Sequence, residues 1–290
     1  MLICNVSQEL LDTFYQSKDK PLTLEREELF NSEDFRYKRF SVNECFVLQS
    51  PSKGSAIIRS LGRDQYKLVD PKTRIDNSIK AKDAEQLTLL DMLVDDEIKI
   101  LAVTGPPGAG KTFLSLAYAA TKVLMDKKKN LICTKSTETV KTSKFFGAVP
   151  GTVDDKFGIF LESFDLAMRK VFPDNVQYEM MKTQKKISFK PVEFCRGDSR
   201  ENTILICDES QNMTWHEVKT LVSRFGEDCK VILLGDLRQK DIRAHEKSGF
   251  EMMFESETFK NSPLTGYVHL INDYRGPISK LISDVDQEIN

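Results

Sequence analysis

The sequence predicts an α/β protein in which a parallel β-sheet carries helices on both faces, preceded by a smaller domain with a β meander. Two patterns predict this class. From residue 83 onward, short apolar runs alternate with segments whose apolar side chains recur every three or four residues. Between residues 45 and 69, β-prone runs are instead separated by glycine, proline and aspartate, which is typical of antiparallel strands. We therefore expect a small accessory domain over residues 1–78 and a larger domain over residues 79–290.

The accessory domain is expected to begin with helices and to continue as strands. Residues 1–40 hold short amphipathic pieces with many charges, which indicates one or two helices packed on the rest of the protein. The β-prone runs that follow each end at turn-forming residues, so strands are expected at 45–48, 55–59 and 66–69. The turn-rich stretch 71–78 is the expected linker.

In the larger domain, apolar runs predict strands and amphipathic segments predict helices. Strands are expected at 98–104, 130–134, 203–207, 230–234 and 267–271, and helices at 84–94, 113–125, 154–170, 214–225 and from 277. Parallel strands that are joined by helices bring their carboxyl ends to one edge of the sheet. We expect ligands to bind at that edge.

Composition excludes several classes of protein. The chain has 40% hydrophobic and 30% charged residues, typical of a soluble globular protein, and its net charge of −2 gives no global sign of a polyanionic partner. Six cysteines without a CxxC pair and three distant histidines argue against a disulfide framework or a zinc site. No apolar run reaches the ~18 residues of a membrane span, and no signal-peptide pattern is present, so we expect a cytoplasmic protein without membrane contact.

The strongest motif is GxxxxGK[ST], which lies between an apolar run and a helical segment, as this phosphate-binding loop requires. Its glycines let backbone N–H groups surround an anion, and the following helix adds its N-terminal partial charge. Lys111 is expected to reach the β- and γ-phosphates, and the Thr112 hydroxyl to ligate Mg²⁺. A glycine-rich turn without a ligand is the alternative. The predicted nucleotide-binding residues are Gly105, Pro106, Pro107, Gly108, Ala109, Gly110, Lys111, Thr112 and Phe113.

Two acidic residues follow the predicted strand 203–207. In a phosphate-loop protein, Asp208 would hold Mg²⁺, usually through water, and Glu209 would orient and deprotonate the attacking water. The alternative is that both acids cap the helix that starts near residue 214. Gln239, after another strand, could contact the γ-phosphate, although a simple turn is also open there. Gln86 is placed to contact an adenine edge, and only its position argues for this role.

A basic segment with interspersed aromatic residues is the candidate nucleic-acid site. Lysines can contact phosphates and phenylalanines can stack on bases, so RNA or single-stranded DNA is the expected partner. A solvated β-hairpin with its phenylalanines in the core is the equal alternative. The residues are Lys182, Lys185, Lys186, Lys190, Arg196 and Arg200, with Phe189 and Phe194 between them.

These motifs together resemble the PhoH family of ATPases, which are related to superfamily 1 helicases. The resemblance runs from about Ser41 to the C-terminus. It is carried by Asn43–Leu48, Glu85-Gln86, Leu89-Leu90, the phosphate-binding loop, Val149–Gly151, Arg196-Gly197, Asp208–Thr214, Arg224–Gly226, Gly235-Asp236, Gln239 and Asp241. The meander resembles the ATPase half of bacterial fusions in which this ATPase follows a PIN ribonuclease domain, although residues 1–40 are too short for that nuclease and lack its dispersed pattern of acids.

The resemblance implies a RecA-like core that hydrolyses ATP in a reaction coupled to RNA or single-stranded nucleic acid. It also implies a homo-oligomer, of which a hexameric ring is one form. The chain departs from the family pattern at three places. Asp83 replaces the usual asparagine before the adenine-side glutamine, which affects base recognition, and Asp198 replaces an arginine of the basic site. Residues 272–276 match the C-terminal motif only in part.

We therefore expect an ATPase that depends on Mg²⁺. Its transition state calls for a further arginine. Arg224 and Arg275 are the candidates, since both are expected near the nucleotide-bearing edge of the sheet, and we favour action on ATP held by an adjacent subunit. Two other functions stay open: a nucleotide-gated clamp or adaptor without unwinding activity, and a small-molecule kinase.

Overall fold

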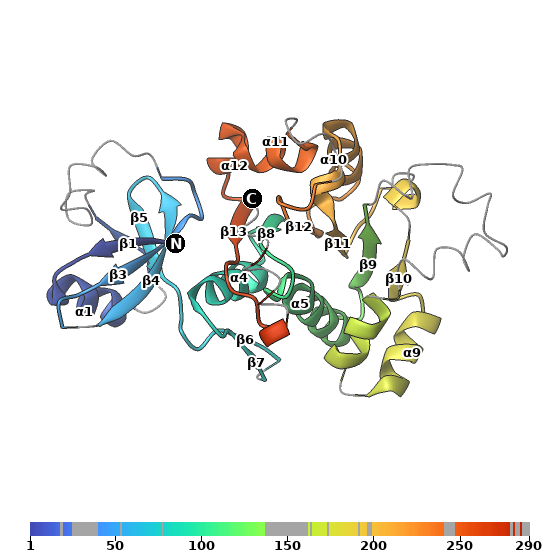
Figure 1. The fold of residues 1–290 in the computed structure, drawn as a ribbon, viewed down its shortest axis with the longest axis horizontal. Helices are drawn as coiled ribbons and strands as arrows, with labels where there is room; N and C mark the ends of the chain where they lie inside the picture. The colour runs from blue at the N-terminus through green and yellow to red at the C-terminus, as the bar shows by residue number, and fades with distance from the viewer. Residues whose placement is uncertain are drawn as a thin grey trace. The chain divides into compact units, whose positions relative to one another are not determined.

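The computed structural model describes residues 1–17, 20–24, 40–52, 54–76, 78–136, 162, 164–172, 174–190, 192–195, 199–240, 247–278, 281 and 285. The chain divides into two compact units (Figure 1). One unit comprises residues 1–98 with 254–268, and the other comprises residues 99–253 with 269–290. The domain boundary expected between residues 78 and 79 stays a prediction.

The first unit contains a five-stranded sheet in the order β1-β3-β4-β5-β2. Strands β3, β4 and β5 pair antiparallel and form the expected meander, whereas β1 pairs parallel with β3. The bounds are Leu2–Asn5 for β1, Leu22–Thr23 for β2, Cys45–Gln49 for β3, Ser55–Gly62 for β4 and Gln65–Leu68 for β5. The expectation of only helices in residues 1–40 was therefore wrong for β1 and β2. These runs are too short to show a pattern, and their pairing with neighbouring strands decides their conformation.

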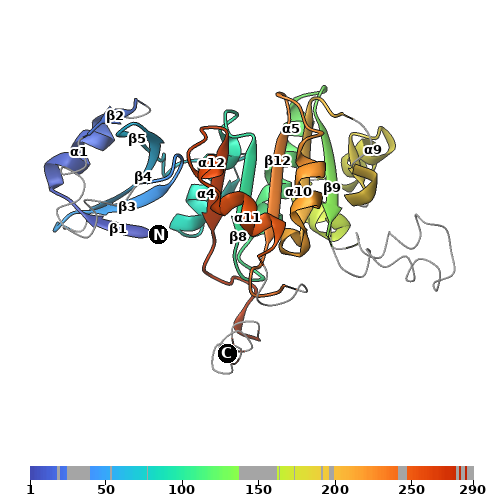
Figure 2. The ribbon, with the colours of Figure 1, turned by 90° about the horizontal axis from the view of Figure 1, so that it is seen from above.

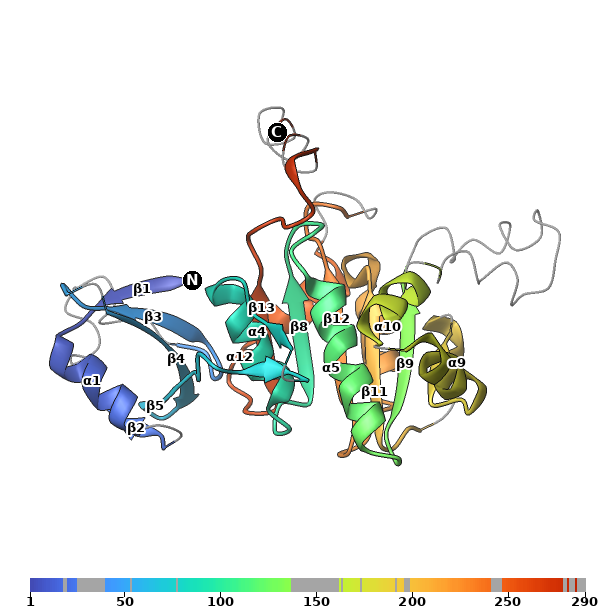
Figure 3. The ribbon, with the colours of Figure 1, turned by 90° about the horizontal axis from the view of Figure 1, so that it is seen from below.

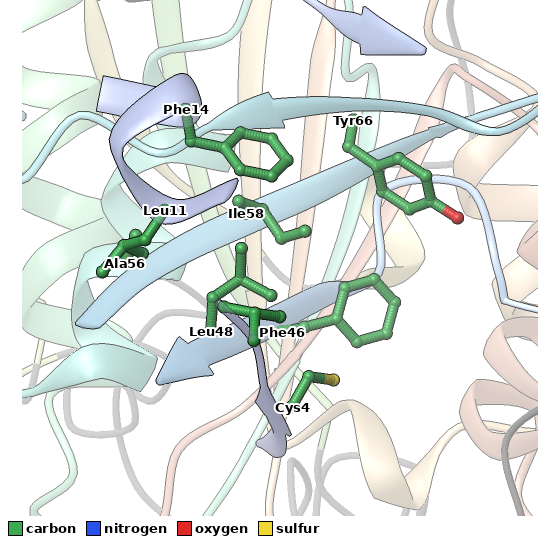
Figure 4. Packing of buried hydrophobic residues seen from close by; sticks show 9 residues of the cluster. Cys4, Leu11, Phe14, Phe46, Leu48, Ala56, Ile58 and Tyr66 are labelled. Atoms are coloured by element: carbon green, nitrogen blue, oxygen red, sulfur yellow. The ribbon is translucent and has the colours of Figure 1, made fainter. Parts of the chain in front are cut away.

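Helix α1 (Gln8–Ser17) covers this sheet and completes a hydrophobic core. Figure 4 shows Leu11 and Phe14 of α1 in one cluster with Phe46, Leu48 and Ile58 of the strands. The same unit contains the β6–β7 ribbon (Arg74–Ile75 and Ile79–Lys80), α4 (Ala84–Val94) and α12 (Glu257–Lys260).

Helix α4 is anchored to strand β4 by a buried ion pair within the first unit. The Arg59 guanidinium lies 3.2 Å from an Asp91 carboxylate oxygen and also contacts Asp95. At the other end of the helix, the Asp83 side chain accepts a hydrogen bond of 2.7 Å from the Gln86 N–H and caps α4. Gln86 thus belongs to a helix fixed at both ends.

The second unit is built on a sheet of order β10-β9-β11-β12-β8, and β13 follows β8 at the edge. The first five strands are parallel neighbours, and the boundary between the units passes through β13, whose last residue lies in the second unit. Their bounds are Ile100–Thr104 for β8, Asn130–Lys135 for β9, Ile187–Phe189 for β10, Thr203–Asp208 for β11, Lys230–Gly235 for β12 and Thr265–His269 for β13.

Helices cover both faces of this sheet, so the predicted α/β class and RecA-like fold are confirmed. Figure 1 and Figure 3 show α5 (Lys111–Met125) and α10 (Trp215–Val222) on opposite faces, and Figure 2 shows α9 (Asn175–Thr183) beyond β9. Helix α11 spans Gly249–Glu255. The central strands β11 and β12 are buried along almost their whole length, as expected for apolar runs covered on both faces. None of the helices in the described ranges is both long and apolar enough to cross a bilayer.

Candidate nucleotide-binding site

The loop between β8 and α5 has the backbone geometry of a phosphate cradle. Gly105, Gly108 and Gly110 all have positive φ, at 145°, 83° and 97°. A side chain is strained in these conformations, and a Cβ on Gly105 would lie only 2.4 Å from the carbonyl oxygen of Leu270. Gly110 forms the N-cap of α5, so the helix N-terminus and its free N–H groups face the loop.

Lys111 extends back over its own loop. Its Nζ donates hydrogen bonds to the carbonyl oxygens of Gly105 at 2.6 Å and Pro106 at 2.9 Å. Burial lowers the pKa of Lys111, and the nearby carboxylates of Asp208 and Asp236 only partly oppose this shift. Lys111 is thus a partly buried cation whose charge the nearby carboxylates stabilise only in part, and the phosphates of a nucleotide would supply the missing negative charge.

Asp208 stands at the carboxyl end of β11, facing the loop. The Thr112 hydroxyl donates to its Oδ2 at 3.0 Å, and the Glu209 N–H donates to its Oδ1 at 2.9 Å. Burial raises the pKa of Asp208, and the neighbouring charge of Glu209 raises it further. The structure therefore keeps a carboxylate where its charge is costly unless a cation is near.

These residues fit Mg²⁺. A hydroxyl and a carboxylate oxygen lie together at Thr112 and Asp208, and the buried Asp236 Oδ2 has no hydrogen-bond partner. No group of three or more His, Cys, Asp or Glu side chains that could hold a metal occurs among the described residues. Mg²⁺ usually takes one or two carboxylates together with the substrate's phosphates, so this sparse donor set matches its preference.

Asp208→Asn is expected to raise the melting temperature of the nucleotide-free protein at pH 7. Because the folded-state pKa of Asp208 is raised, the folded state binds its proton more tightly, and stability falls as pH rises through that interval. Asparagine keeps the shape without the charge. A gain of about 2–4 °C, corresponding to roughly 1 kcal/mol, should appear in calorimetric scans and shrink as the pH approaches the ordinary aspartate range. A lower melting temperature at pH 7 would contradict this account.

Glu209 is held between two side chains. Its Oε1 lies 3.5 Å from Lys135 Nζ, and its Oε2 accepts a hydrogen bond of 2.7 Å from Gln211 Nε2. Lys135 ends β9 directly opposite Asp208 in the strand register. The backbone of Glu209 is left-handed, with φ 55°, which turns the chain sharply after Asp208. The two acids thus face different partners.

The alternative that Asp208 and Glu209 cap the following helix is wrong. Thr214 is the N-cap of α10, and it forms a capping box with Glu217 in which each side chain bonds the other residue's N–H. Thr214 and Glu217 therefore satisfy the N-terminus of α10. Neither Asp208 nor Glu209 is needed to cap this helix.

Gln211 is a site residue that sequence reasoning missed. Its amide joins Glu209 to the turn after β12, because Nε2 also donates to the Gln239 carbonyl oxygen at 3.0 Å and Oε1 accepts from the Asp236 N–H at 3.1 Å. A signal was present: Gln211 lies two residues beyond the acidic pair, at the carboxyl edge. Gln239 itself is exposed, and its predicted contact with a γ-phosphate stays a prediction.

Arg275 lies beside the phosphate-binding loop of its own chain. Its Cγ would be 2.7 Å from a Cβ placed on Gly108, and the preceding Tyr274 N–H donates to the Gly108 carbonyl oxygen at 3.1 Å. Its positive charge also contributes to lowering the pKa of Lys111. The placement at the nucleotide-bearing edge thus holds for Arg275.

The same placement is wrong for Arg224. Its carbonyl oxygen accepts a hydrogen bond of 2.7 Å from the Arg200 N–H, and Arg200 precedes β11. Helix α10 runs from the carboxyl edge of the sheet back to the amino edge, and Arg224 follows its end. Within its own chain, Arg224 therefore lies at the edge opposite Asp208, and only a role toward a neighbouring subunit stays a prediction.

Gln86 and Phe113 also stay predictions. Gln86 is buried in the first unit, where its Oε1 accepts a hydrogen bond of 2.9 Å from the Lys82 N–H. Phe113 follows Thr112 on α5 and is partly exposed.

The basic segment is not a β-hairpin, because β10 pairs parallel with β9. Lys182 is occupied by Asp165, at 2.9 Å, and Phe189 stacks on Phe164 with ring centroids 6.3 Å apart. Lys185 and Lys186 precede β10 and Lys190 follows it, so they lie at opposite edges of the sheet. Arg196 and the side chain of Phe194 lie outside the described residues.

Comparison with known proteins gives a consistent result. A model of the family described as PhoH-like protein matches residues 78–285. Protein PhoH2 of Bacillus subtilis is 27% identical over 97% of this chain and 62% of its own length. Protein PhoH of Escherichia coli K12 is 28% identical over 68% of this chain and 54% of its own length. The chain thus spans between half and two thirds of these relatives.

Among solved structures, the Pif1 helicase from Candida albicans aligns with a TM-score of 0.38 and 18% identity, over 71% of this chain and 43% of that one.

Proposed function

Because the chain belongs to the PhoH family, we propose that it binds ATP with Mg²⁺ and hydrolyses it in a reaction coupled to RNA or single-stranded DNA. The observation that carries the proposal is the meeting of three groups at one edge of the sheet. The partly buried Lys111 lies in the phosphate-binding loop, the partly buried Asp208 carboxylate accepts a hydrogen bond from Thr112, and two partners orient the neighbouring Glu209 carboxylate. Each group matches a task in phosphoryl transfer to water.

The residues divide this work by position. Lys111 and the loop N–H groups bind the β- and γ-phosphates, and Thr112 with Asp208 would hold Mg²⁺, which neutralises charge on the phosphate oxygens. Glu209 accepts a proton from water as the water oxygen bonds to the γ-phosphorus and the bond to the β-phosphate bridging oxygen breaks. Arg275, beside the loop, supplies further positive charge to the phosphoryl group.

Coupling to nucleic acid is proposed at the carboxyl edge of β10, where Lys190 lies on the same edge as Asp208. The Lys190 N–H donates to the Cys133 carbonyl oxygen at 3.0 Å, which fixes its backbone next to β9. Lys185, at the opposite edge, is a matched control because it is also a lysine, is exposed and belongs to the same segment.

ATP turnover is expected to rise when poly(U) RNA or oligo(dT) is added. Lys190→Ala should weaken polynucleotide binding and reduce the slope of log affinity against log salt by about one, whereas Lys185→Ala should leave both near the wild-type values. Fluorescence anisotropy at several salt concentrations measures the slope. Equal slopes for all three proteins would remove Lys190 from the interface, and a lack of stimulation by either polymer would favour a clamp or adaptor that responds to nucleotide alone.

A homo-oligomer, including a ring, is proposed from the family resemblance alone. In such an assembly, Arg224 at the far edge of the sheet would be available to a neighbouring subunit.

A further inference from the structure

We propose that Gln211 is a positioning residue for the reaction. It holds the Glu209 carboxylate at a fixed position relative to the segment Asp236–Gln239. This inference rests on the proposed ATP hydrolysis and adds a residue through which the two halves of the site are joined. Gln211 is completely buried, and it lies on the short helical turn Ser210–Asn212 between β11 and α10.

Both the nitrogen and the oxygen of the Gln211 side-chain amide form hydrogen bonds. Nε2 donates one hydrogen to Glu209 Oε2 at 2.7 Å and the other to the Gln239 carbonyl oxygen at 3.0 Å. Oε1 accepts from the Asp236 N–H at 3.1 Å. The carboxylate at the end of β11 and the turn after β12 are therefore connected by a single side chain.

This set of contacts needs a primary amide at the length of the glutamine side chain. Two donors and one acceptor are needed on one planar group, so a carboxylate would place an acceptor against Glu209 and a thioether would donate nothing. Space for the amide comes from Gly235, where a Cβ would lie 2.9 Å from Gln211 Oε1. The absence of a side chain at the end of β12 thus permits the bridge.

The segment that Gln211 contacts is anchored at its other end. Lys240 Nζ lies 3.1 Å from both carboxylate oxygens of Glu251, and Ser248 also donates to Glu251. Burial acts to raise the pKa of Glu251, but its hydrogen bonds to Ser248 and Lys240 outweigh burial and lower it, so the anchor is charged at neutral pH. Because Gln211 bonds both Gln239 and Glu209, a shift of Gln239 on contact with a γ-phosphate would move the Gln211 amide and with it the Glu209 carboxylate.

Gln211→Met is the decisive variant because it keeps the side-chain length and removes every hydrogen bond of the amide. We expect kcat for ATP to fall about 100-fold, as for a misplaced catalytic group, while the dissociation constant for ADP changes by less than about threefold. In a Glu209→Gln background, Gln211→Met should cause little further loss, since both act on the same carboxylate. Losses that multiply in the double variant would overturn the proposal.

A second measurement does not depend on turnover. In protein labelled with ¹⁵N-glutamine, the side-chain amide signal of Gln211 should shift on Glu209→Ala. It should also shift more with a non-hydrolysable ATP analogue than with ADP. Gln211→Asn keeps the amide but is one methylene shorter, so it should give the same loss of kcat, and ADP binding near the wild-type affinity shows that this variant is folded. If wild-type protein binds ATP without hydrolysing it, the proposed function fails, but the amide signal still tests whether Gln211 connects Glu209 to the segment Asp236–Gln239. A Gln211 amide signal that is unaffected by Glu209→Ala would overturn the proposed positioning role of Gln211.

Discussion

Lys111→Ala is expected to reduce ATP turnover at least about 10³-fold. The Lys111 ammonium group is the cationic contact that the loop offers to the β- and γ-phosphates, and its charge is most needed as the phosphoryl group transfers. Its Nζ is held over the loop by hydrogen bonds to the carbonyl oxygens of Gly105 and Pro106, a position that no other lysine of the loop can take. Steady-state phosphate release measures the loss.

Lys122→Ala is the matched control for this substitution. Lys122 lies near the end of the same helix and its Nζ is 5.7 Å from the Tyr118 ring, away from the loop. Turnover of Lys122→Ala should equal that of the wild type. Wild-type turnover in a well-folded Lys111→Ala protein would refute the assignment of the phosphate-binding loop.

Glu209→Gln is expected to retain ATP binding and to lower hydrolysis by about 10²–10⁴-fold, the contribution typical of a general base. Glutamine has the same shape and can still accept a hydrogen bond from Gln211 through its amide oxygen, but it cannot take a proton from water. Equilibrium binding of ATP and single-turnover hydrolysis separate the two effects.

Glu217→Gln serves as the control. Glu217 is close to Glu209 in the sequence, but its side chain belongs to the capping box of α10 and has no part in the proposed reaction. It should affect stability more than turnover. If Glu209→Gln abolished ATP binding as well as hydrolysis, Glu209 would be a structural residue of the loop rather than the base.

The parts of the site that were predictable from the sequence are those with fixed spacing. Strand, glycine-rich loop and helix follow one another without interruption, so Gly105, Gly108 and Lys111 could be placed by the motif alone. Asp208 and Glu209 could be placed because an apolar strand brought them to the carboxyl edge. In both cases, local sequence order determines position.

The parts that were not predictable depend on contacts between distant segments. The position of Gln211 near the acidic pair marks it as a candidate, but nothing in the neighbouring sequence indicates that it also bonds Asp236 and Gln239 in the turn after β12. Arg224 was misplaced because residue spacing does not show how far α10 returns across the sheet. Strand β1 is too short for a periodic pattern and exists through its pairing with β3.

The central claim, that this site transfers the γ-phosphate of ATP to water, is tested most directly by following the fate of that phosphate. Wild-type protein would be incubated with ATP labelled in the γ-phosphate, with Mg²⁺ and with poly(U) RNA. The account predicts that the label appears as inorganic phosphate in step with ADP, and that chelation of Mg²⁺ stops its appearance. Label transferred to another acceptor, or ATP recovered intact after binding, would contradict it.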